Sequence, residues 1–208
     1  MIVQHNITSM NSNRQLGIVG NNLAKSTEKL SSGYRINRAA DDAAGLAISE
    51  KMRAQVRGLN RASDNAQDGI SLIQTAEGAM DQQHAILQRA RELVVQASNS
   101  GVLDKDSDDD FQKIQDELNE IGKEFERINT DTEFNKKKLL DGTYKSQYFQ
   151  VGANKEQGIS VTIAKTAWAN PTITGGDGKG NSAVVDTIDT MIKGVTTERS
   201  KLDRKSVV

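Results

Sequence analysis

The chain has 208 residues, and its 27 Lys and Arg residues nearly balance its 28 Asp and Glu residues, which leaves a net charge of -1. This balance gives no electrostatic argument for a nucleic-acid or membrane partner, and the lack of cysteine excludes disulfides, thiolate metal sites and cysteine nucleophiles. Aromatic residues make up only 4% of the chain, which is low for a compact core and typical of a helical rod.

The first predicted helix follows a short lead-in at Met1 and ends at Ser32. Leu16, Leu23 and Leu30 recur every seven positions, and the rest of the segment is rich in Asn, Ser and Gln. A helix this polar is marginal in isolation, so we expect it to become ordered only against a partner. Gly33 is predicted to end it as a left-handed C-cap residue.

A connector follows, from Gly33 to Gly45. The side-chain oxygens of Asn37, Asp41 and Asp42 are candidate N-caps for the next helix. Arg35 and Arg38 have two interpretations, which are solvated surface charge and a contact with another subunit.

A long amphipathic helix is predicted from Ile48 to Ala97, because apolar residues repeat there at heptad spacing along two seams. At about 1.5 Å per residue, roughly 50 residues form a rod of about 75 Å, which is too long for a compact core and needs equally long partners. The first seam is Met52, Leu59, Ala66, Ile73, Met80, Leu87 and Val94; the second is Ile48, Ala62, Ala76, Ala90 and Ala97, with interruptions at Gln55, Gly69 and Gln83.

A second helix is predicted to start at residues 107–110, where acidic side chains complement the helix N-terminus. A stop at residues 99–101 separates it from the long helix, so the two form an antiparallel hairpin. Residues 129–135 are interpreted as a polar break. The apolar seam of this helix is Phe111, Ile114, Leu118, Ile121, Phe125 and Ile128.

The periodicity changes after Leu139. Residues 139–142 are expected to form a turn, and residues 148–151 and 159–163 the two strands of a small β-hairpin. Residues 174–182 are interpreted as a flexible connector, and Val185 to Leu202 as a last heptad helix that docks on the rod. The predicted fold class is therefore mainly α, a long antiparallel helical rod or coiled-coil bundle with a small β-hairpin.

No catalytic constellation is recognisable. The acidic run from Asp104 to Asp108 resembles a calcium loop, but Asp109 and Gln115 stand where such a loop needs Gly and Glu. His5 and His84 lie far apart in the sequence without neighbouring ligands. The sequence predicts neither an enzyme nor a cofactor or metal site.

Several long motifs, in order, resemble the N-terminal region of bacterial flagellin. They are MIVQHNITSMNSNRQLG at residues 1–17, LAKSTEKLSSGYRINRAADDAAGLAISEKMRAQVRGLNRASDNAQDGISLIQTAEGAM at 23–80, LQRARELVVQASN at 87–99, FNKKKLLDG at 134–142 and QVGAN at 150–154. The resemblance covers residues 1–163 and the helix at 182–202.

This resemblance implies a structural subunit that self-assembles through its helices into the flagellar filament for motility. It assigns residues 1–42 to an inner-core helix and connector, 43–163 to an outer-core rod with the β-hairpin, 164–181 to a short flexible loop in place of variable domains, and 182–208 to the start of a C-terminal outer-core helix. Because residues 203–208 depart from the family, we expect a truncated chain with exposed seams. The self-assembly candidates are Leu16, Leu23, Leu30, Arg35 and Arg38.

The resemblance also implies a patch that binds the host Toll-like receptor for flagellin. Its residues match Gln88, Arg89, Arg91, Glu92, Leu93 and, on the second helix, Glu117. Arg89 and Glu92 are expected to offer hydrogen bonds around Leu93 as an apolar anchor. One alternative to a filament subunit is a secreted flagellin fragment acting mainly as a receptor ligand. Another is the related hook–filament junction protein, which shares the end segments, but the close match through LQRARELVVQASN favours flagellin.

The remaining expectations concern partners and location. The family implies contacts with other flagellin subunits, an export chaperone and the filament cap. The polar start of the chain lacks the apolar stretch of a secretory signal, and no segment reaches the length of about 20 apolar residues that a membrane span needs. We therefore expect an extracellular protein of the flagellum that leaves the cell by the flagellar type III route without a cleaved signal peptide.

Overall fold

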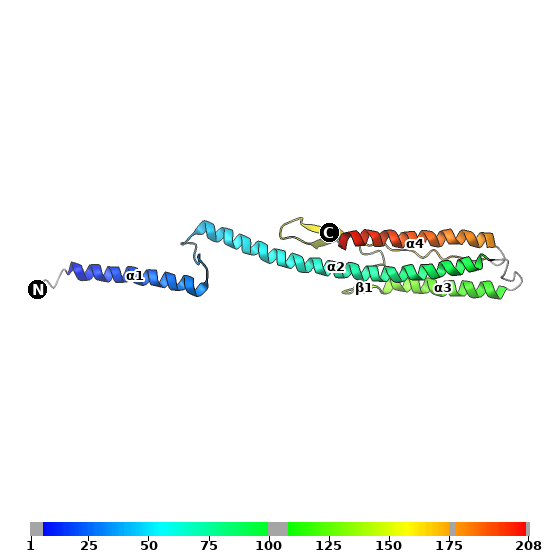
Figure 1. The fold of residues 1–208 in the computed structure, drawn as a ribbon, viewed down its shortest axis with the longest axis horizontal. Helices are drawn as coiled ribbons and strands as arrows, with labels where there is room; N and C mark the ends of the chain where they lie inside the picture. Colours follow the sequence, from blue (N-terminus) through cyan, green and yellow to red (C-terminus); the bar gives the residue numbers. More distant parts are fainter. Residues whose placement is uncertain (1–5, 100–107, 175–177, 207–208) are drawn as a thin grey trace. The chain divides into compact units, whose positions relative to one another are not determined.

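The structure is a computed structural model that describes residues 6–99, 108–174 and 178–206. The chain divides into two compact units, Met1–Gly58 and Leu59–Val208, and the division falls within the longest helix (Figure 1). The two units are described separately below.

Unit 1 contains helix α1, Ile7–Ser32, and the first turns of helix α2, Ala43–Ala97. The Asn6 side chain begins α1 by accepting a hydrogen bond of 3.1 Å from the Ser9 amide. Gly33 ends it with a φ of 71°, and its amide donates to the Lys29 carbonyl over 3.0 Å. The predicted left-handed cap is thereby confirmed.

The connector between the two helices folds onto the start of α2. The Gly45 amide donates to Asp42 Oδ1 over 2.8 Å, which confirms Asp42 as the N-terminal cap. Gly45 leaves room for Ile36, because a Cβ there would lie 2.9 Å from Ile36 Cδ1. The Arg53 guanidinium carbon stands 4.5 Å above the centre of the Tyr34 ring in a cation–π contact.

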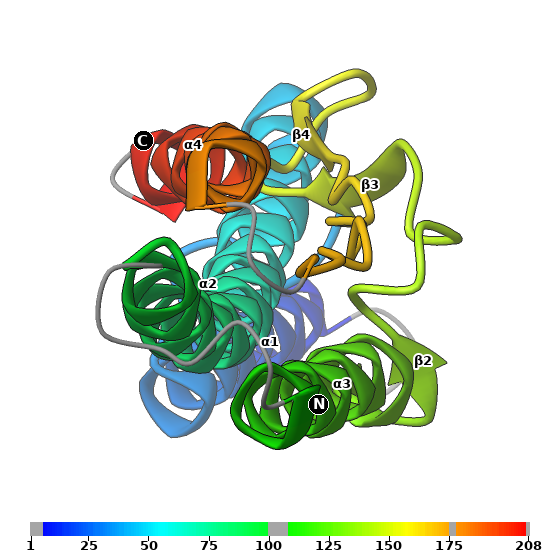
Figure 2. The same ribbon diagram turned by 90° about the vertical axis from the view of Figure 1, so that its right-hand side faces the viewer.

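Unit 2 is a helical bundle in which α3, Asp108–Asp131, and α4, Gly178–Ser206, pack against the remaining part of α2 (Figures 1 and 2). The predicted partners of the rod are confirmed, because seam residues of all three helices share one buried core. That core includes Ile73, Met80, Leu87 and Val94 of α2, Phe111, Ile114, Leu118 and Phe125 of α3, and Ile188, Val195 and Leu202 of α4.

The buried face of α2 begins at Ala62 and includes two residues that were interpreted as interruptions of the seam. Gly69 is buried and leaves room for the Phe149 ring, because a Cβ there would lie 3.3 Å from Phe149 Cδ1. Gln83 is fully buried and hydrogen-bonded. Both residues therefore belong to the packed face, and the interpretation as interruptions is wrong.

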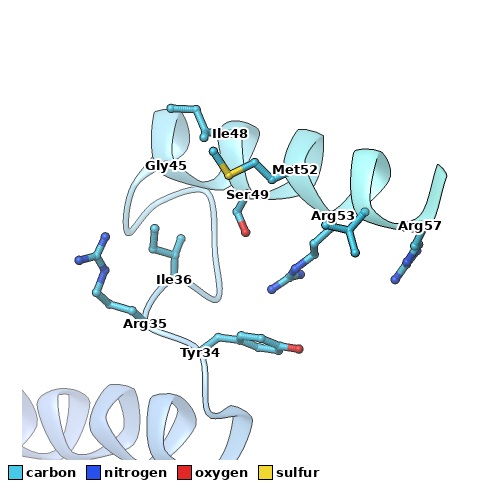
Figure 3. A pocket seen from close by; sticks show the side chains of 10 residues that line it. Tyr34, Arg35, Ile36, Gly45, Ile48, Ser49, Met52, Arg53 and Arg57 are labelled. Carbon is cyan, nitrogen blue, oxygen red and sulfur yellow. The ribbon is translucent and has the colours of Figure 1, made fainter. Parts of the chain in front are cut away.

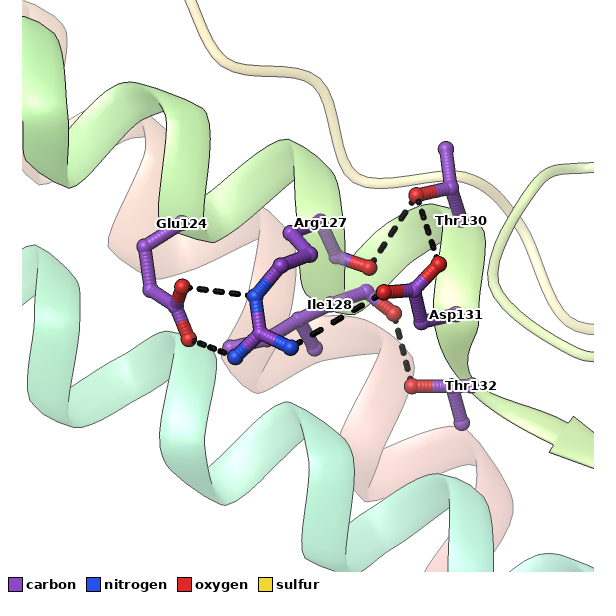
Figure 4. A network of polar contacts seen from close by, with 6 residues as sticks. All are labelled: Glu124, Arg127, Ile128, Thr130, Asp131 and Thr132. Carbon is purple, nitrogen blue, oxygen red and sulfur yellow. Dashed lines mark hydrogen bonds and ion pairs between the residues drawn. The ribbon is translucent and has the colours of Figure 1, made fainter.

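Helix α3 extends as far as Asp131, three residues into the polar break predicted at residues 129–135. Asn129 is fully buried within the helix, and Thr132 Oγ1 donates to the Ile128 carbonyl over 2.6 Å at its end (Figure 4). On the outer face, Arg127 pairs with Glu124 (Figure 4). The prediction of a break at Asn129 is wrong, because buried hydrogen bonds satisfy its amide.

Two small antiparallel sheets follow α3. Strands β1, Glu133–Phe134, and β2, Lys137–Lys138, form a hairpin that was not predicted. Strands β3, Gln147–Gln150, and β4, Gly158–Val161, form the predicted one, with Phe149 opposite Ile159. Phe149, Ile159 and Val161 pack on the core, which explains how so short a hairpin is stabilised.

Residues 164–174 follow β4 as an extended segment packed on the bundle. Trp168 lies 5.7 Å from Phe125 between ring centroids, and Gly122 makes room for it, because a Cβ there would lie 2.5 Å from Trp168 Nε1. Thr166 and Ile173 are also buried. This part of the segment predicted as a flexible loop at 164–181 is therefore held by the core.

Helix α4 begins at Gly178, four residues before the predicted start at residue 182. Asn181 is buried, its Nδ2 donates to the Ala97 carbonyl at the end of α2 over 3.2 Å, and its Oδ1 accepts from the Thr174 amide over 2.8 Å. These bonds offset the low helix propensity of the glycines around it. The interpretation of residues 178–181 as loop is wrong, whereas the domain boundaries stay a prediction.

Within residues 6–99, 108–174 and 178–206, no helix has the length and apolar character needed to cross a membrane. The same residues contain no group of three His, Asp or Glu side chains placed to hold a metal ion. His5 and the run from Asp104 to residue 107 lie outside the described residues.

Candidate assembly surfaces

Helix α1 presents its apolar side chains to solvent. None of its 26 residues is buried, and Leu16, Leu23 and Leu30 are 70%, 67% and 86% exposed. Among the described residues, eleven of the fifteen exposed large hydrophobic side chains lie in unit 1. So many exposed large apolar side chains in one unit are characteristic of a protein–protein interface.

A second surface of unit 1 is an open hollow of about 600 Å³, which we call the connector groove (Figure 3). The connector forms one side of the groove, and the first turns of α2 form its floor. Ile48, Met52 and Val56 lie along α2 at four-residue spacing, and each is more than half exposed. The groove is lined by Tyr34, Arg35, Ile36, Gly45, Ile48, Ser49, Met52, Arg53, Val56 and Arg57.

The connector groove is positively charged. Three guanidinium groups line it and no carboxylate does. Arg53 pairs with Glu50 at 2.9 Å, whereas Arg35 and Arg57 have no ion pair with any residue that the structure describes. Unit 1 as a whole has eight Lys and Arg residues against four Asp and Glu residues in its sequence. A partner with carboxylates would therefore complement it.

The self-assembly residues predicted from the sequence lie in different settings. The three leucines of α1 are exposed, and Arg35 lines the connector groove. Arg38 instead pairs with Glu28 at 3.0 Å, which ties the connector to α1. The other groove residues were not predicted as site residues, although Ile48 and Met52 belong to the apolar seams of the long helix.

The predicted receptor patch is partly assembled on unit 2. Arg89 donates from Nε and Nη2 to Glu117 Oε1 over 3.1 and 2.9 Å, and from Nη1 to Glu92 Oε2 over 3.2 Å. The hydrogen bonds that Arg89 donates to Glu117 and then to Glu92 raise the pKa of Arg89 above its usual value. Arg91 points elsewhere and pairs with Asp189 on α4 at 2.9 Å. Arg89, Glu92 and Glu117 therefore form one exposed cluster without Arg91.

Two other members of the patch differ in exposure. Gln88 is exposed and its Nε2 lies 2.9 Å from His84 Nε2. Leu93 is only 2% exposed and belongs to the core, so its predicted role as an apolar anchor on the surface is wrong. The two narrow heptad seams did not include Leu93, because the bundle buries a wider face of α2 than a two-stranded coil would. The exposed apolar side chain nearby in the sequence is Val95.

Comparison with known proteins shows the family to which this chain belongs. The family model described as the bacterial flagellin N-terminal helical region matches residues 3–145 of this chain. The chain belongs to the bacterial flagellin family. Flagellin is a structural protein family of the flagellar filament, an extracellular assembly, and not a family of enzymes. The predicted resemblance and the mainly helical fold class are both confirmed.

Individual relatives agree with this assignment. Flagellin of Halalkalibacterium halodurans is 50% identical over 209 residues, which cover 97% of this chain and 75% of that one. Flagellin of Bacillus subtilis is 57% identical over 173 residues, which cover 78% of this chain and a smaller share, 56%, of that protein. The crystal structure of Bacillus cereus flagellin is similar in fold, with a TM-score of 0.58 at 22% identity, over 68% of this chain and 81% of that one.

Proposed function

We propose that this flagellin polymerises into the filament mainly through unit 1, with the exposed face of α1 and the connector groove as intersubunit contacts. The observation that carries the proposal is that α1, 26 residues long, buries none of its residues within this chain. Family membership supports the same role.

The physical reason is the cost of leaving these side chains in water. Each large aliphatic side chain that becomes buried contributes about 1.5–3 kcal/mol, and a subunit interface would bury several of them at once. A helix as polar as α1 gains little stability on its own, so contacts with neighbouring subunits also supply the stability that it lacks in isolation.

The test is polymerisation of the purified chain, followed by light scattering and electron microscopy. The double variant Leu23→Ser, Leu30→Ser should abolish polymer while leaving the thermal unfolding of unit 2 unchanged, because neither leucine is buried. Lys25→Ser on the same helix serves as the matched control and should polymerise normally. Absence of polymer from the unmodified chain, or normal polymer from the double variant, would refute the proposal.

A second proposal is recognition by the host Toll-like receptor for flagellin. The family resemblance suggests it, and the exposed cluster of Arg89, Glu92 and Glu117 supports it, because such groups can form charge-assisted hydrogen bonds with a receptor. In a receptor reporter assay, Arg89→Ala should lower the signal and Arg127→Ala, on the outer face of α3, should not. An equal signal from all three proteins would refute the assignment. Gln88 and Arg91 remain part of the family-based prediction.

We further propose that the chain leaves the cell by the flagellar type III route and meets an export chaperone and the filament cap on the way. Family membership is the support for this proposal. Secretion into the medium should require the flagellar export apparatus, and co-purification before export should recover the chaperone. Secretion from a strain without that apparatus would refute the route.

A further inference from the structure

Building on the filament role above, we propose that the connector groove of one copy binds a specific surface on unit 2 of a second copy. We call this surface the Glu92 face. It consists of Gln88, Glu92 and Val95 on α2 and Glu117 on α3.

The groove defines the chemistry of its occupant. Its floor is the apolar stripe of Ile48, Met52 and Val56, which are 56%, 60% and 57% exposed. Its rim carries Arg35 and Arg57, neither of which has an ion pair with the described residues. A complementary surface therefore needs an apolar side chain beside a cluster of charges that is negative overall.

The Glu92 face has this composition. Val95 is 48% exposed and lies three residues after Glu92, so the two side chains share one face of α2. Glu92 and Glu117 both pair with the single guanidinium of Arg89, which leaves the cluster with a net negative charge.

Charge excludes α1 as the occupant. Its exposed leucines could cover the apolar floor of the groove, but the helix carries Arg14, Lys25 and Lys29 against the single acid Glu28. A basic helix would place like charges beside the guanidinium groups of the rim, which opposes association.

Two other described surfaces lack one of the two required features. The outer face of α3 is strongly acidic, but its apolar side chains face the core. Ile70 is exposed on α2, yet its neighbours on the same face, Gln67 and Gln74, are uncharged. Of these three surfaces, the Glu92 face is the one that combines an exposed apolar residue with net negative charge.

Cross-linking tests the contact directly, because the chain has no cysteine of its own. A tagged Val56→Cys copy is mixed with an untagged Val95→Cys copy under polymerising conditions and mild oxidation. We expect a mixed disulfide dimer on a non-reducing gel. In the matched control, a Ser71→Cys copy replaces the Val95→Cys copy, because Ser71 is exposed on α2 outside both surfaces. This pair should give little mixed disulfide dimer. Equal cross-linking to residues 71 and 95 would overturn the proposal.

Charge reversal tests the assigned chemistry. Arg57→Glu in the Val56→Cys copy should lower the yield of mixed dimer about tenfold, and Glu92→Arg in the Val95→Cys copy should restore it. Arg61→Glu is the control, because Arg61 lies outside the groove and pairs with Asp64 at 3.6 Å. The proposal would be overturned if Arg57→Glu left the yield of mixed dimer unchanged, or if Glu92→Arg did not restore that yield.

Failure of this inference can be told apart from failure of the proposed function. If the unmodified chain scatters light as a polymer but the residue 56–95 dimer does not form, only the docking of the Glu92 face in the groove is wrong. If the unmodified chain forms no polymer and the residue 56–95 dimer does not form either, the role of unit 1 in polymerisation fails as well.

Discussion

Gln83 on α2 donates its side-chain amide to Asn129 Oδ1 on α3 over 2.8 Å, and both residues are fully buried. Asn129 in turn donates to the Thr166 carbonyl over 3.0 Å, and Thr166 Oγ1 donates to Gln83 Oε1 over 3.0 Å. The three residues close a ring of hydrogen bonds that joins two helices to the extended segment after β4.

Replacing Asn129 by Ala should destabilise unit 2 by about 2 kcal/mol, because the buried Gln83 amide and the Thr166 carbonyl lose their partner. Urea unfolding followed by circular dichroism measures this change in the free energy of unfolding. Asn119→Ala is the matched control, since Asn119 is exposed on the same helix and accepts only from Gln115. A loss no larger than that of the control would show that water replaces the missing hydrogen bonds.

Gly122→Ala should displace the only tryptophan of the chain. A Cβ at residue 122 would lie 2.5 Å from Trp168 Nε1, so the ring must shift away from Phe125, at a cost of about 1 kcal/mol. Tryptophan fluorescence should shift to longer wavelength as the ring becomes more exposed. Gly78→Ala is the control: nothing lies within 4 Å of a Cβ there, so the helix should gain about 0.5–1 kcal/mol. Unchanged fluorescence in Gly122→Ala would contradict the packing of Trp168.

Stability should depend on pH through Glu77. Burial, and then the charge of Asp203, raise the pKa of Glu77 in the folded protein above its ordinary value of 4.5, and its Oε1 atom is buried without a hydrogen-bond partner. The stability that this carboxyl contributes is therefore fully present below pH 4.5, and it is lost as the pH rises through the pKa that Glu77 has in the folded protein. Glu77→Gln should raise the melting temperature at about pH 7 and leave it nearly unchanged at about pH 4. A lower melting temperature at neutral pH would contradict this.

Glu124 should show the opposite pH dependence. Its hydrogen bonds with Arg127 lower the pKa of the Glu124 carboxyl in the folded state (Figure 4). The stabilisation that this pair gives the folded state is present when the pH is above the pKa of Glu124 in the unfolded chain. It is lost as the pH falls through the pKa of Glu124 in the folded protein. Glu124→Gln should therefore lower the melting temperature slightly at neutral pH and have no effect in strong acid. Because the pair is exposed, the change should be small.

Hydrogen exchange should divide α2 into two regions. Backbone amides between Leu72 and Ala97, which lie in the packed part of the helix, should be strongly protected. Amides between Ile48 and Gly58 should exchange much faster in the monomer, because their side chains are largely exposed. Mass spectrometry of exchanged peptides measures the difference. Equal protection in both regions would contradict the lack of tertiary cover over the first turns of α2.

Heptad periodicity predicted the long helix, its two helical partners and the core positions of the first seam from Ile73 to Val94. It failed where a polar residue or a glycine occupied a seam position, because periodicity cannot show that Gln83 and Asn129 satisfy each other across two helices. The early start of α4 was missed for a similar reason. The hydrogen bond from Asn181 to Ala97 joins residues 84 positions apart, and local helix propensity cannot predict such a contact.

The candidate surfaces were only partly predictable. The exposed leucines of α1 followed from a polar helix without a partner in the sequence. The connector groove did not, since it depends on Ile36 folding back onto α2 at Gly45, a position where the sequence offers only an N-cap signal. Leu93 was misplaced because motif resemblance identifies residues in a binding region but gives no information on which of them the core covers.

The ring formed by Gln83, Asn129 and Thr166 has one more consequence. Apolar residues at strict seven-residue spacing look alike when one helix slides along another by a heptad, so hydrophobic packing alone discriminates weakly between such alignments. A one-heptad slide would move Gln83 by roughly 10 Å along the axis and leave two buried amides without partners. The three polar residues thus select a single axial alignment of the helices in the bundle.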